Sequence, residues 1–165
     1  MMAYRFRPVT VPDLDLLAAW KREPHVAEWW DEDVTTAAEL LDPRVSMRIV
    51  ERDGRAFAFV QDYDVHGWEG HHLADLPRLS RGMDQFIGDP VMLGRGHGKA
   101  LIFQRMTELF AGGAPALAVD PHPANARAIA VYRRVGFEPA GEARETRWGP
   151  VLPMVAWAPA APRSS

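Results

Sequence analysis

The chain has 165 residues, a formal net charge of −3 and no cysteine. This length predicts one domain that folds without cross-links, and the lack of cysteine excludes disulfides, thiolate metal sites and a cysteine nucleophile. The negative charge argues against nucleic acid as a partner. Because the sequence has neither a membrane-spanning apolar stretch nor an apolar signal-peptide core near Met1, we expect a cytoplasmic protein without membrane contacts.

The first part of the chain is predicted to hold one strand and two helices. Residues 4–7 alternate in polarity and predict a strand. Thr10 is typical of a helix N-cap, and the helix that follows ends before Pro24. A second, short helix is expected over residues 35–41.

The middle of the chain is predicted to form antiparallel strands. Residues 46–52 and 55–64 have strand character, and the Asp-Gly pair at 53–54 between them is a strong hairpin signal. Residues 65–80 show little periodicity and predict a loop, long enough to suggest a functional role. A further strand is expected over 82–88.

The last part of the chain alternates helices and strands. We expect helices over 99–110 and 124–135, and strands over 116–119, 137–146 and 151–157. The whole order predicts an α/β (α+β) domain over residues 1–157, with helices on both faces of one mixed central sheet. Residues 158–165 are rich in Ala, Pro and Ser and predict a disordered tail.

A glycine-rich loop, LGRGHG at 93–98, stands between a predicted strand and a predicted helix. Glycine lets the backbone turn tightly and approach a ligand, and the helix N-terminus offers unpaired N–H groups. The combination indicates an anion site suited to a pyrophosphate. The loop lacks the Gly-Lys-Ser/Thr of a P-loop and comes too late in the chain for a dinucleotide fingerprint. A glycine turn without any ligand is the alternative.

Two segments together resemble the GCN5-related N-acetyltransferase (GNAT) family. The first is LGRGHG, and the second is DPHPANARAIAVYRRVGF over 120–137. Leu93 departs from the Gln or Arg usual at that position. The resemblance implies a central sheet of about seven mostly antiparallel strands. It also implies acetyl-coenzyme A as acyl donor, with no metal.

The same resemblance assigns roles at the cofactor. It implies that the glycine loop binds the pyrophosphate, that Asn125 contacts the pantetheine arm, and that Tyr132 protonates the departing thiolate. We also expect Arg95 and His97 to face the phosphates through charge as well as backbone, and N–H groups near Met92 and Leu93 to polarise the thioester carbonyl. The expected cofactor-binding residues are Met92, Leu93, Gly94, Arg95, Gly96, His97, Gly98, Lys99, Asn125, Ala128 and Tyr132.

Further segments, HVAEWW at 25–30, QDY at 61–63 and GMDQFIG at 82–88, are similar to bacterial aminoglycoside 6′-N-acetyltransferases. This implies that the acetyl group moves by direct attack of a primary amine. The acceptor would be the 6′-amine of an aminoglycoside or related amino sugar, a small and cationic molecule. A monomer or a homodimer is expected.

Asp84 is the expected base. An amine attacks a thioester only when neutral, so an ammonium group needs a proton acceptor nearby. Asp84 matches an acidic residue that the aminoglycoside enzymes place at the reacting amine, where it acts as base or as amine-binding acid. Partial desolvation beside Phe86 would raise its pKa towards a useful range. The alternative is a sheet-edge acid that contacts backbone.

The expected substrate wall combines aromatic and acidic side chains. An acidic run, Glu28, Asp31, Glu32 and Asp33, would attract a cation. Trp148 stands where the aminoglycoside enzymes often carry an acid before Gly-Pro, which predicts weaker recognition of a polycation. The expected substrate-binding residues are Trp29, Trp30, Asp62, Tyr63, Asp84, Asp120 and Trp148.

Two other functions stay open at this point. One is acylation of a hydroxylamine or other small amine in siderophore synthesis, whose hallmark would be a His where this chain has Asp84. The other is a non-catalytic acyl-coenzyme A sensor. Three histidines lie in the loop at 65–80, but their spacing matches no standard ligand pattern, so we expect no metal site.

Overall fold

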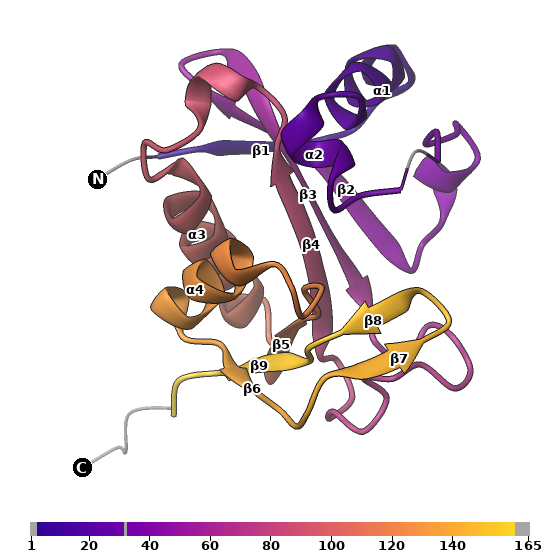
Figure 1. Cartoon of the computed structure of the whole chain (residues 1–165). Coiled ribbons are helices and arrows are strands. Elements are labelled where there is room, and N and C mark those ends of the chain that lie inside the picture. The colour runs from indigo at the N-terminus through magenta and orange to yellow at the C-terminus, as the bar shows by residue number, and fades with distance from the viewer. Residues whose placement is uncertain (1–2, 32, 161–165) are drawn as a thin grey trace.

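The computed structural model describes residues 3–31 and 33–160 of the protein. Glu32 of the acidic run and residues 161–165 of the predicted tail lie outside the described residues. The fold is built on a seven-stranded sheet with the order β1-β2-β3-β4-β5-β9-β6 (Figure 1). Its strands, in sheet order, are β1 (Arg5–Pro8), β2 (Val45–Arg52), β3 (Arg55–Asp64), β4 (Arg81–Ile87), β5 (Ala116–Val119), β9 (Met154–Trp157) and β6 (Glu138–Pro139).

Helices cover both faces of the sheet (Figure 1). The helices are α1 (Leu14–Lys21), α2 (Pro24–Ala27), α3 (His97–Ala111) and α4 (Ala126–Val135), with short 3₁₀ helices η1 (Val11–Asp13), η2 (Glu39–Leu41) and η3 (Pro90–Met92). In the described part of the chain, no helix combines the length and the apolar character needed to cross a bilayer.

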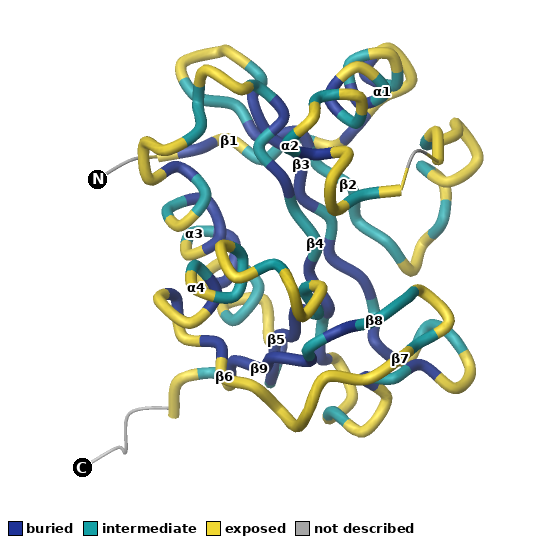
Figure 2. The backbone as a smooth tube through the Cα atoms, in the orientation of Figure 1, coloured by how far each residue is buried: buried dark blue, intermediate teal, exposed yellow. Residues whose placement is uncertain are grey.

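Strand alternation sends neighbouring side chains into two cores, because successive residues point to opposite faces. Val60 and Met83 pack with Leu101 beneath α3 and α4. Phe59 and Phe86 point to the opposite face of the sheet and pack beneath α1 and α2. In Figure 2, β5 is dark along its whole length and β3 along most of it, whereas β4 alternates between buried and intermediate residues.

β4 and β5 separate soon after they meet. They run parallel and pair only at Arg81–Leu117 and Gly82–Ala118, whereas every other pairing in the sheet is antiparallel. From Met83 to Ile87, β4 pairs with β3 on one edge and leaves its other edge unpaired with β5. The sheet therefore opens between these two strands, and this opening positions the site.

The structure confirms the predicted hairpin and corrects the C-terminal strands. β2 and β3 are joined at Asp53 and Gly54, both at positive φ (51° and 78°), as a hairpin turn requires. The prediction of two long strands over 137–146 and 151–157 is wrong. The chain forms β6 and β9 in the main sheet and a separate ribbon of β7 (Arg144–Thr146) and β8 (Gly149–Val151). Proline and glycine in this segment interrupt the strands.

The second predicted helix is also shorter than expected. Only η2 forms within residues 35–41. The hydroxyl of Thr36 donates a hydrogen bond to Glu39 at 2.9 Å, so the side chain acts at the start of this short turn.

Candidate active site

A cleft of about 980 Å³ lies where β4 and β5 diverge. Its walls come from β4, the glycine loop with the start of α3, the segment at 120–125, α4, and the segment at 25–31. The predicted site residues that line it are Trp29, Trp30, Asp84, Leu93, Gly94, Gly96, His97, Gly98, Lys99, Asp120, Asn125, Ala128 and Tyr132. Residues expected to bind a cofactor and residues expected to bind an amine thus share one cavity.

The glycine loop shapes the N-terminus of α3 for an anion. Gly94 and Gly96 have φ of +69° and +81°, a conformation that side chains disfavour. Gly96 is the N-cap of α3, which is 15 residues long. The first N–H groups of such a helix have no partner within it, and its dipole places positive potential at this end. These residues therefore fit the pyrophosphate of coenzyme A.

His97 does not offer its charge to this anion site. Its imidazole Nδ1 lies 2.8 Å from the hydroxyl of Tyr4, and the residue is 3% exposed. Burial, helped by the positive charges of Arg52 and Arg95, lowers the pKa of His97. The expectation that the His97 side chain faces the phosphates is therefore wrong, and only its backbone can do so.

The N–H groups of Met92 and Leu93 are also unavailable to a thioester carbonyl. They donate to the carbonyl oxygens of Asp89 and Pro90 at 3.0 and 3.2 Å, inside the turn of η3. The expectation that these two groups polarise the carbonyl is corrected by this geometry. Met92 packs against the core and Arg95 is exposed, and neither is among the residues that line the cleft.

Asn125 and Tyr132 are positioned by α4. Asn125 is the N-cap of this helix, and its Oδ1 accepts a hydrogen bond from the Ala128 N–H at 3.1 Å. Tyr132, about two turns further along, accepts a hydrogen bond from Gln85 Nε2 at 2.6 Å. Burial raises the pKa of Tyr132, and the charge of Asp84 adds to this. Tyr132 therefore keeps its proton and has it free to donate.

Asp84 lies on the opposite face of β4 from Gln85. Its Oδ2 accepts a hydrogen bond from Gln61 Nε2 at 2.9 Å. Burial and, to a smaller extent, the charge of Asp120 raise the pKa of Asp84, the bond from Gln61 lowers it, and the net result is a pKa of about 7. A carboxyl that titrates near neutral pH can accept and release a proton under ordinary conditions.

Trp29 and Trp30 both line the cleft but differ in their packing. The Trp30 ring packs edge-on against Phe86 and Phe59, with centroids 4.8 and 6.0 Å apart. The Trp29 ring is 38% exposed and lies 5.5 Å from the ring of His122. Trp30 is thus mainly a core residue, while Trp29 is the aromatic surface that a ligand can contact.

Negative side chains also line the cleft. Glu28 and Asp31 of the acidic run line it, as does Asp120 at the end of β5. Asp33 offers its backbone carbonyl to Lys21 Nζ at 2.6 Å and is not a lining residue. A cationic ligand is attracted to this arrangement.

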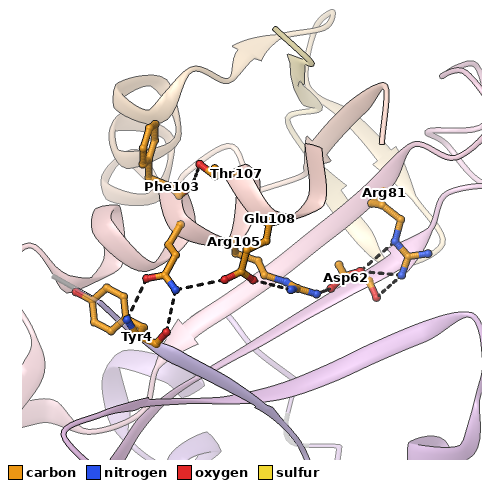
Figure 3. A network of polar contacts seen from close by, with 8 residues as sticks. Tyr4, Asp62, Arg81, Phe103, Arg105, Thr107 and Glu108 are labelled. Atoms are coloured by element: carbon orange, nitrogen blue, oxygen red, sulfur yellow. Dashed lines mark hydrogen bonds and ion pairs between the residues drawn. The ribbon is translucent and has the colours of Figure 1, made fainter. Parts of the chain in front are cut away.

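Asp62 lies away from the cleft, which corrects its expected role in substrate binding. Its Oδ1 accepts from Arg105 and its Oδ2 from Arg81, each at 2.8 Å (Figure 3). The residue is 2% exposed. Because Gln61 points towards Asp84, strand alternation sends Asp62 to the other face, beneath α3. Its carboxylate forms internal ion pairs with Arg81 and Arg105.

Tyr63 and Trp148 are also outside the cleft lining. The Tyr63 ring covers Gly82 so closely that a Cβ there would lie 2.2 Å from Tyr63 Cζ, and burial raises the pKa of its hydroxyl. Trp148 lies in the β7–β8 turn and packs against His71, with ring centroids 4.9 Å apart. Both residues pack against the loop at 65–80, so the structure shows them in contact with that loop and not at the cleft.

Three polar neighbours of the site were missed by the sequence reasoning. They are Gln61 beside Asp84, Gln85 beside Tyr132, and His72, whose Nε2 lies 2.8 Å from Asp120 Oδ2. The antiparallel register of β3 and β4 pairs Gln61 with Asp84, but the long loop at 65–80 joins these strands, so no turn signal in the sequence indicates this register. Among the described residues, no group of three or more His, Asp or Glu side chains is placed to hold a metal ion.

Comparison with known proteins places this geometry in context. A family model described as an acetyltransferase (GNAT) domain matches residues 10–144. The aminoglycoside N(6′)-acetyltransferases type 1 of Klebsiella pneumoniae and Serratia marcescens are each 30% identical to the chain over 162 residues. The alignment covers 90% of this chain and 80% of each relative.

Solved structures of aminoglycoside acetyltransferases have a similar fold. The aminoglycoside acetyltransferase AAC(6′)-Ib in complex with coenzyme A and kanamycin superposes with a TM-score of 0.81 at 28% identity, covering 94% of this chain and 95% of that one. The same enzyme in complex with paromomycin and acetyl-coenzyme A gives a TM-score of 0.83 at 28% identity, covering 94% and 93%.

Proposed function

Because the chain belongs to the GNAT acetyltransferase family and is an acetyl-coenzyme A-dependent N-acetyltransferase, we propose that its acceptor is the 6′-amine of an aminoglycoside or a related amino sugar. One observation carries the proposal. A single cleft joins an anion-binding helix N-terminus to a carboxyl of near-neutral pKa inside an acidic, aromatic wall. The similar solved enzymes named above hold coenzyme A and aminoglycosides.

The cofactor end of the cleft is the glycine loop with α3 and α4. Backbone N–H groups of Gly94 to Gly98 would hold the pyrophosphate, as at other helix N-termini. Asn125 keeps Oδ1 for the helix cap, which leaves its Nδ2 group as the donor for the pantetheine arm. The unpaired edge of β4 offers further backbone groups. When bound, acetyl-coenzyme A supplies the acetyl thioester.

Asp84 takes the proton of the incoming ammonium group. A carboxyl with an ordinary pKa is a weak base near pH 7, and the raised pKa of Asp84 makes it a stronger one. Gln61 holds Oδ2 at 2.9 Å, so the carboxylate has a defined orientation when the amine arrives. The neutral amine is then the nucleophile.

Tyr132 would donate a proton to the leaving group from the face of β4 that Gln85 occupies. Its hydroxyl accepts from Gln85, so its own proton points to another acceptor. A thiolate that leaves during acyl transfer is such an acceptor. Because Asp84 and Gln85 lie on opposite faces of β4, the base and the acid would act from the two faces of this strand.

The substrate wall favours a cationic, ring-shaped amine. Glu28, Asp31 and Asp120 supply negative charge, and Trp29 supplies an aromatic surface that a sugar ring or a cation can contact. Asp84 stands where the hydroxylamine acyltransferases would carry a His, which disfavours the siderophore alternative. The presence of both Asp84 and Tyr132 in the cleft disfavours a purely binding role.

Thiol release from acetyl-coenzyme A tests the proposal. We expect turnover with aminoglycosides that carry a 6′-amine and none with a matched compound that carries a 6′-hydroxyl. Mass spectrometry should show one added acetyl group on the amine-bearing ring. Binding of acetyl-coenzyme A without thiol release on any aminoglycoside would overturn the proposed acceptor and leave the family assignment intact.

A further inference from the structure

His72 forms a polar contact with Asp120, one of the acidic residues of the expected substrate wall. Its Nε2 lies 2.8 Å from Oδ2 of Asp120, with side-chain exposures of 8% for His72 and 18% for Asp120. Asp120 lines the cleft, whereas His72 is not among the residues that line it. The histidine therefore reaches the acceptor end of the cleft only through the carboxylate that it holds.

The surroundings of His72 select one protonation form. A carboxylate can only accept, so Nε2 of His72 donates to Asp120. Nδ1 of His72 is buried and has no hydrogen-bond partner among the described residues. A proton on Nδ1 would be a buried, unpaired N–H, which is unfavourable. The geometry thus favours the tautomer in which Nε2 carries the proton that it donates to Asp120.

Stacking fixes the plane of the His72 ring. The ring stacks on His71, with centroids 4.4 Å apart and an interplanar angle of 20°, and lies 5.6 Å from the ring of Trp148. His71 is held in turn, since its Nδ1 accepts from the Leu73 N–H at 3.1 Å. Burial and, to a smaller extent, the nearby His72 lower the pKa of His71 to about 4, so His71 is neutral near pH 7.

The β7–β8 ribbon anchors the loop that carries His72. Arg144 donates to the backbone carbonyl of His72, and Arg147 donates to that of Glu69 at 2.9 Å. Trp148, in the turn of the same ribbon, covers the histidine pair. Three residues of one ribbon therefore fix the place of a single imidazole.

Asp120 connects His72 to the base. The charge of Asp120 is the second cause, after burial, of the raised pKa of Asp84. A group that controls the ionisation of Asp120 therefore acts on Asp84 without touching it. The titratable and charged groups around this arrangement are His66, His71, Arg144, Arg147, Asp84, Tyr63 and Tyr132.

We propose that His72 is a positioning residue of this active site, which holds Oδ2 of Asp120 through Nε2–H and so leaves Oδ1 for the ammonium group of the substrate. The inference rests on the proposed function for its meaning in catalysis. The contact itself is a property of the protein without substrate, and it can be tested there.

Carboxyl-detected NMR titration of the protein with ¹³C-labelled aspartate is the first test. Loss of the His72 donor makes the Asp84–Asp120 pair bind protons more tightly, so His72→Leu should raise its apparent pKa by about one unit. His72→Gln places an amide N–H near the position of Nε2 and should restore at least about half of that shift. His66→Leu, in the same loop, is the control and should leave the pair unchanged.

Kinetics supply the second readout. His72→Leu should raise KM for the amine about tenfold, as expected for loss of a charge-assisted hydrogen bond, and change KM for acetyl-coenzyme A by less than about twofold. A purely structural role would instead lower the fraction of active enzyme and leave both KM values alone. If His72→Leu does not fold, His72→Gln against His72→Asn makes the same comparison, because the shorter amide cannot reach Asp120.

The outcomes separate this inference from the proposed function. Unchanged titration of the aspartate pair in a folded His72→Leu variant overturns the role of His72, whatever the substrate is. Failure of the wild-type protein to acetylate any aminoglycoside overturns the acceptor, while the NMR titration still decides the inference.

Discussion

Gln61 and Asp84 are direct partners in the β3–β4 register, and Gln61 Nε2 donates a hydrogen bond to Asp84 Oδ2 at 2.9 Å. The bond stabilises the ionised carboxylate, while burial and the charge of Asp120 favour the protonated form. The balance of these effects leaves Asp84 able to change charge near neutral pH. The first three predictions follow from this balance.

Replacement of Asp84 by Asn should remove the proton acceptor and keep the hydrogen-bonded shape of the site. We expect kcat to fall by about 10²–10⁴, the usual contribution of a positioned base. KM for acetyl-coenzyme A should change little, because Asp84 lies at the acceptor end of the cleft. Thiol release measures both constants. An Asp84→Asn enzyme with wild-type kcat would assign the base elsewhere.

The rate should depend on pH through Asp84. A base must be ionised to act, and the pKa of Asp84 is raised to about 7. We therefore expect kcat/KM to rise with pH up to about 7 and to level off above it. The acid limb should disappear in Asp84→Asn. A limb that stays near pH 4 in the wild type would contradict the raised pKa.

Stability should depend on pH in the opposite direction. Folding raises the pKa of Asp84 from its ordinary value of 3.8 to about 7, so the folded protein binds a proton that the unfolded chain releases in this range. The contribution is fully present below pH 3.8 and is lost as pH rises through 7. Asp84→Asn should therefore raise the free energy of unfolding more at pH 8 than at pH 5, by about 2 kcal/mol. Urea unfolding at the two pH values measures this difference, and an equal gain at both would contradict it.

Replacement of Tyr132 by Phe should remove the proton donor for the leaving thiolate. We expect kcat to fall by about 10–10², with KM for the amine unchanged. The same change frees Gln85 Nε2, whose hydrogen bond to Tyr132 is 2.6 Å long, so a loss of stability of about 1 kcal/mol should accompany it. Steady-state kinetics and thermal unfolding separate the two effects. A variant with unchanged kcat would show that water protonates the leaving group.

Asp62→Ala should affect stability rather than substrate binding. The change leaves the guanidinium groups of Arg81 and Arg105 without their shared carboxylate in a buried place. Removal of one member of a buried ion pair destabilises by about 3–5 kcal/mol. Denaturant unfolding measures the loss. KM for the amine should stay the same in the folded enzyme, and a raised KM would restore the substrate role that the geometry disfavours.

The backbone geometry of the glycine loop was predictable from sequence, because glycine positions are local signals. Gly94 and Gly96 have positive φ, as a tight glycine turn requires. Asn125 lies inside the helix predicted over 124–135, and the structure makes it the N-cap instead. The lowered pKa and the buried orientation of the His97 side chain were not predictable in this way. Its orientation depends on Tyr4, which is 93 residues away in the chain.

The acceptor half was less predictable, because it depends on which face of a strand each residue occupies. Asp62 follows Gln61 and points to the opposite face, so the acid in the sequence motif is buried and the amide is the neighbour of the base. The contacts of His72 and Trp148 join a loop to a ribbon that was itself predicted as long strands. Such long-range contacts leave no periodic signal.

The two-residue pairing between β4 and β5 also has a consequence for the resistance of the protein to unfolding and proteolysis. A cofactor bound in this opening would contact both β4 and α4 and would thereby link the two halves of the domain. A ligand that binds only the folded state adds about 2.7 kcal/mol at a hundred times its dissociation constant. The cellular supply of acetyl-coenzyme A would then set the resistance of this enzyme to proteolysis as well as its rate.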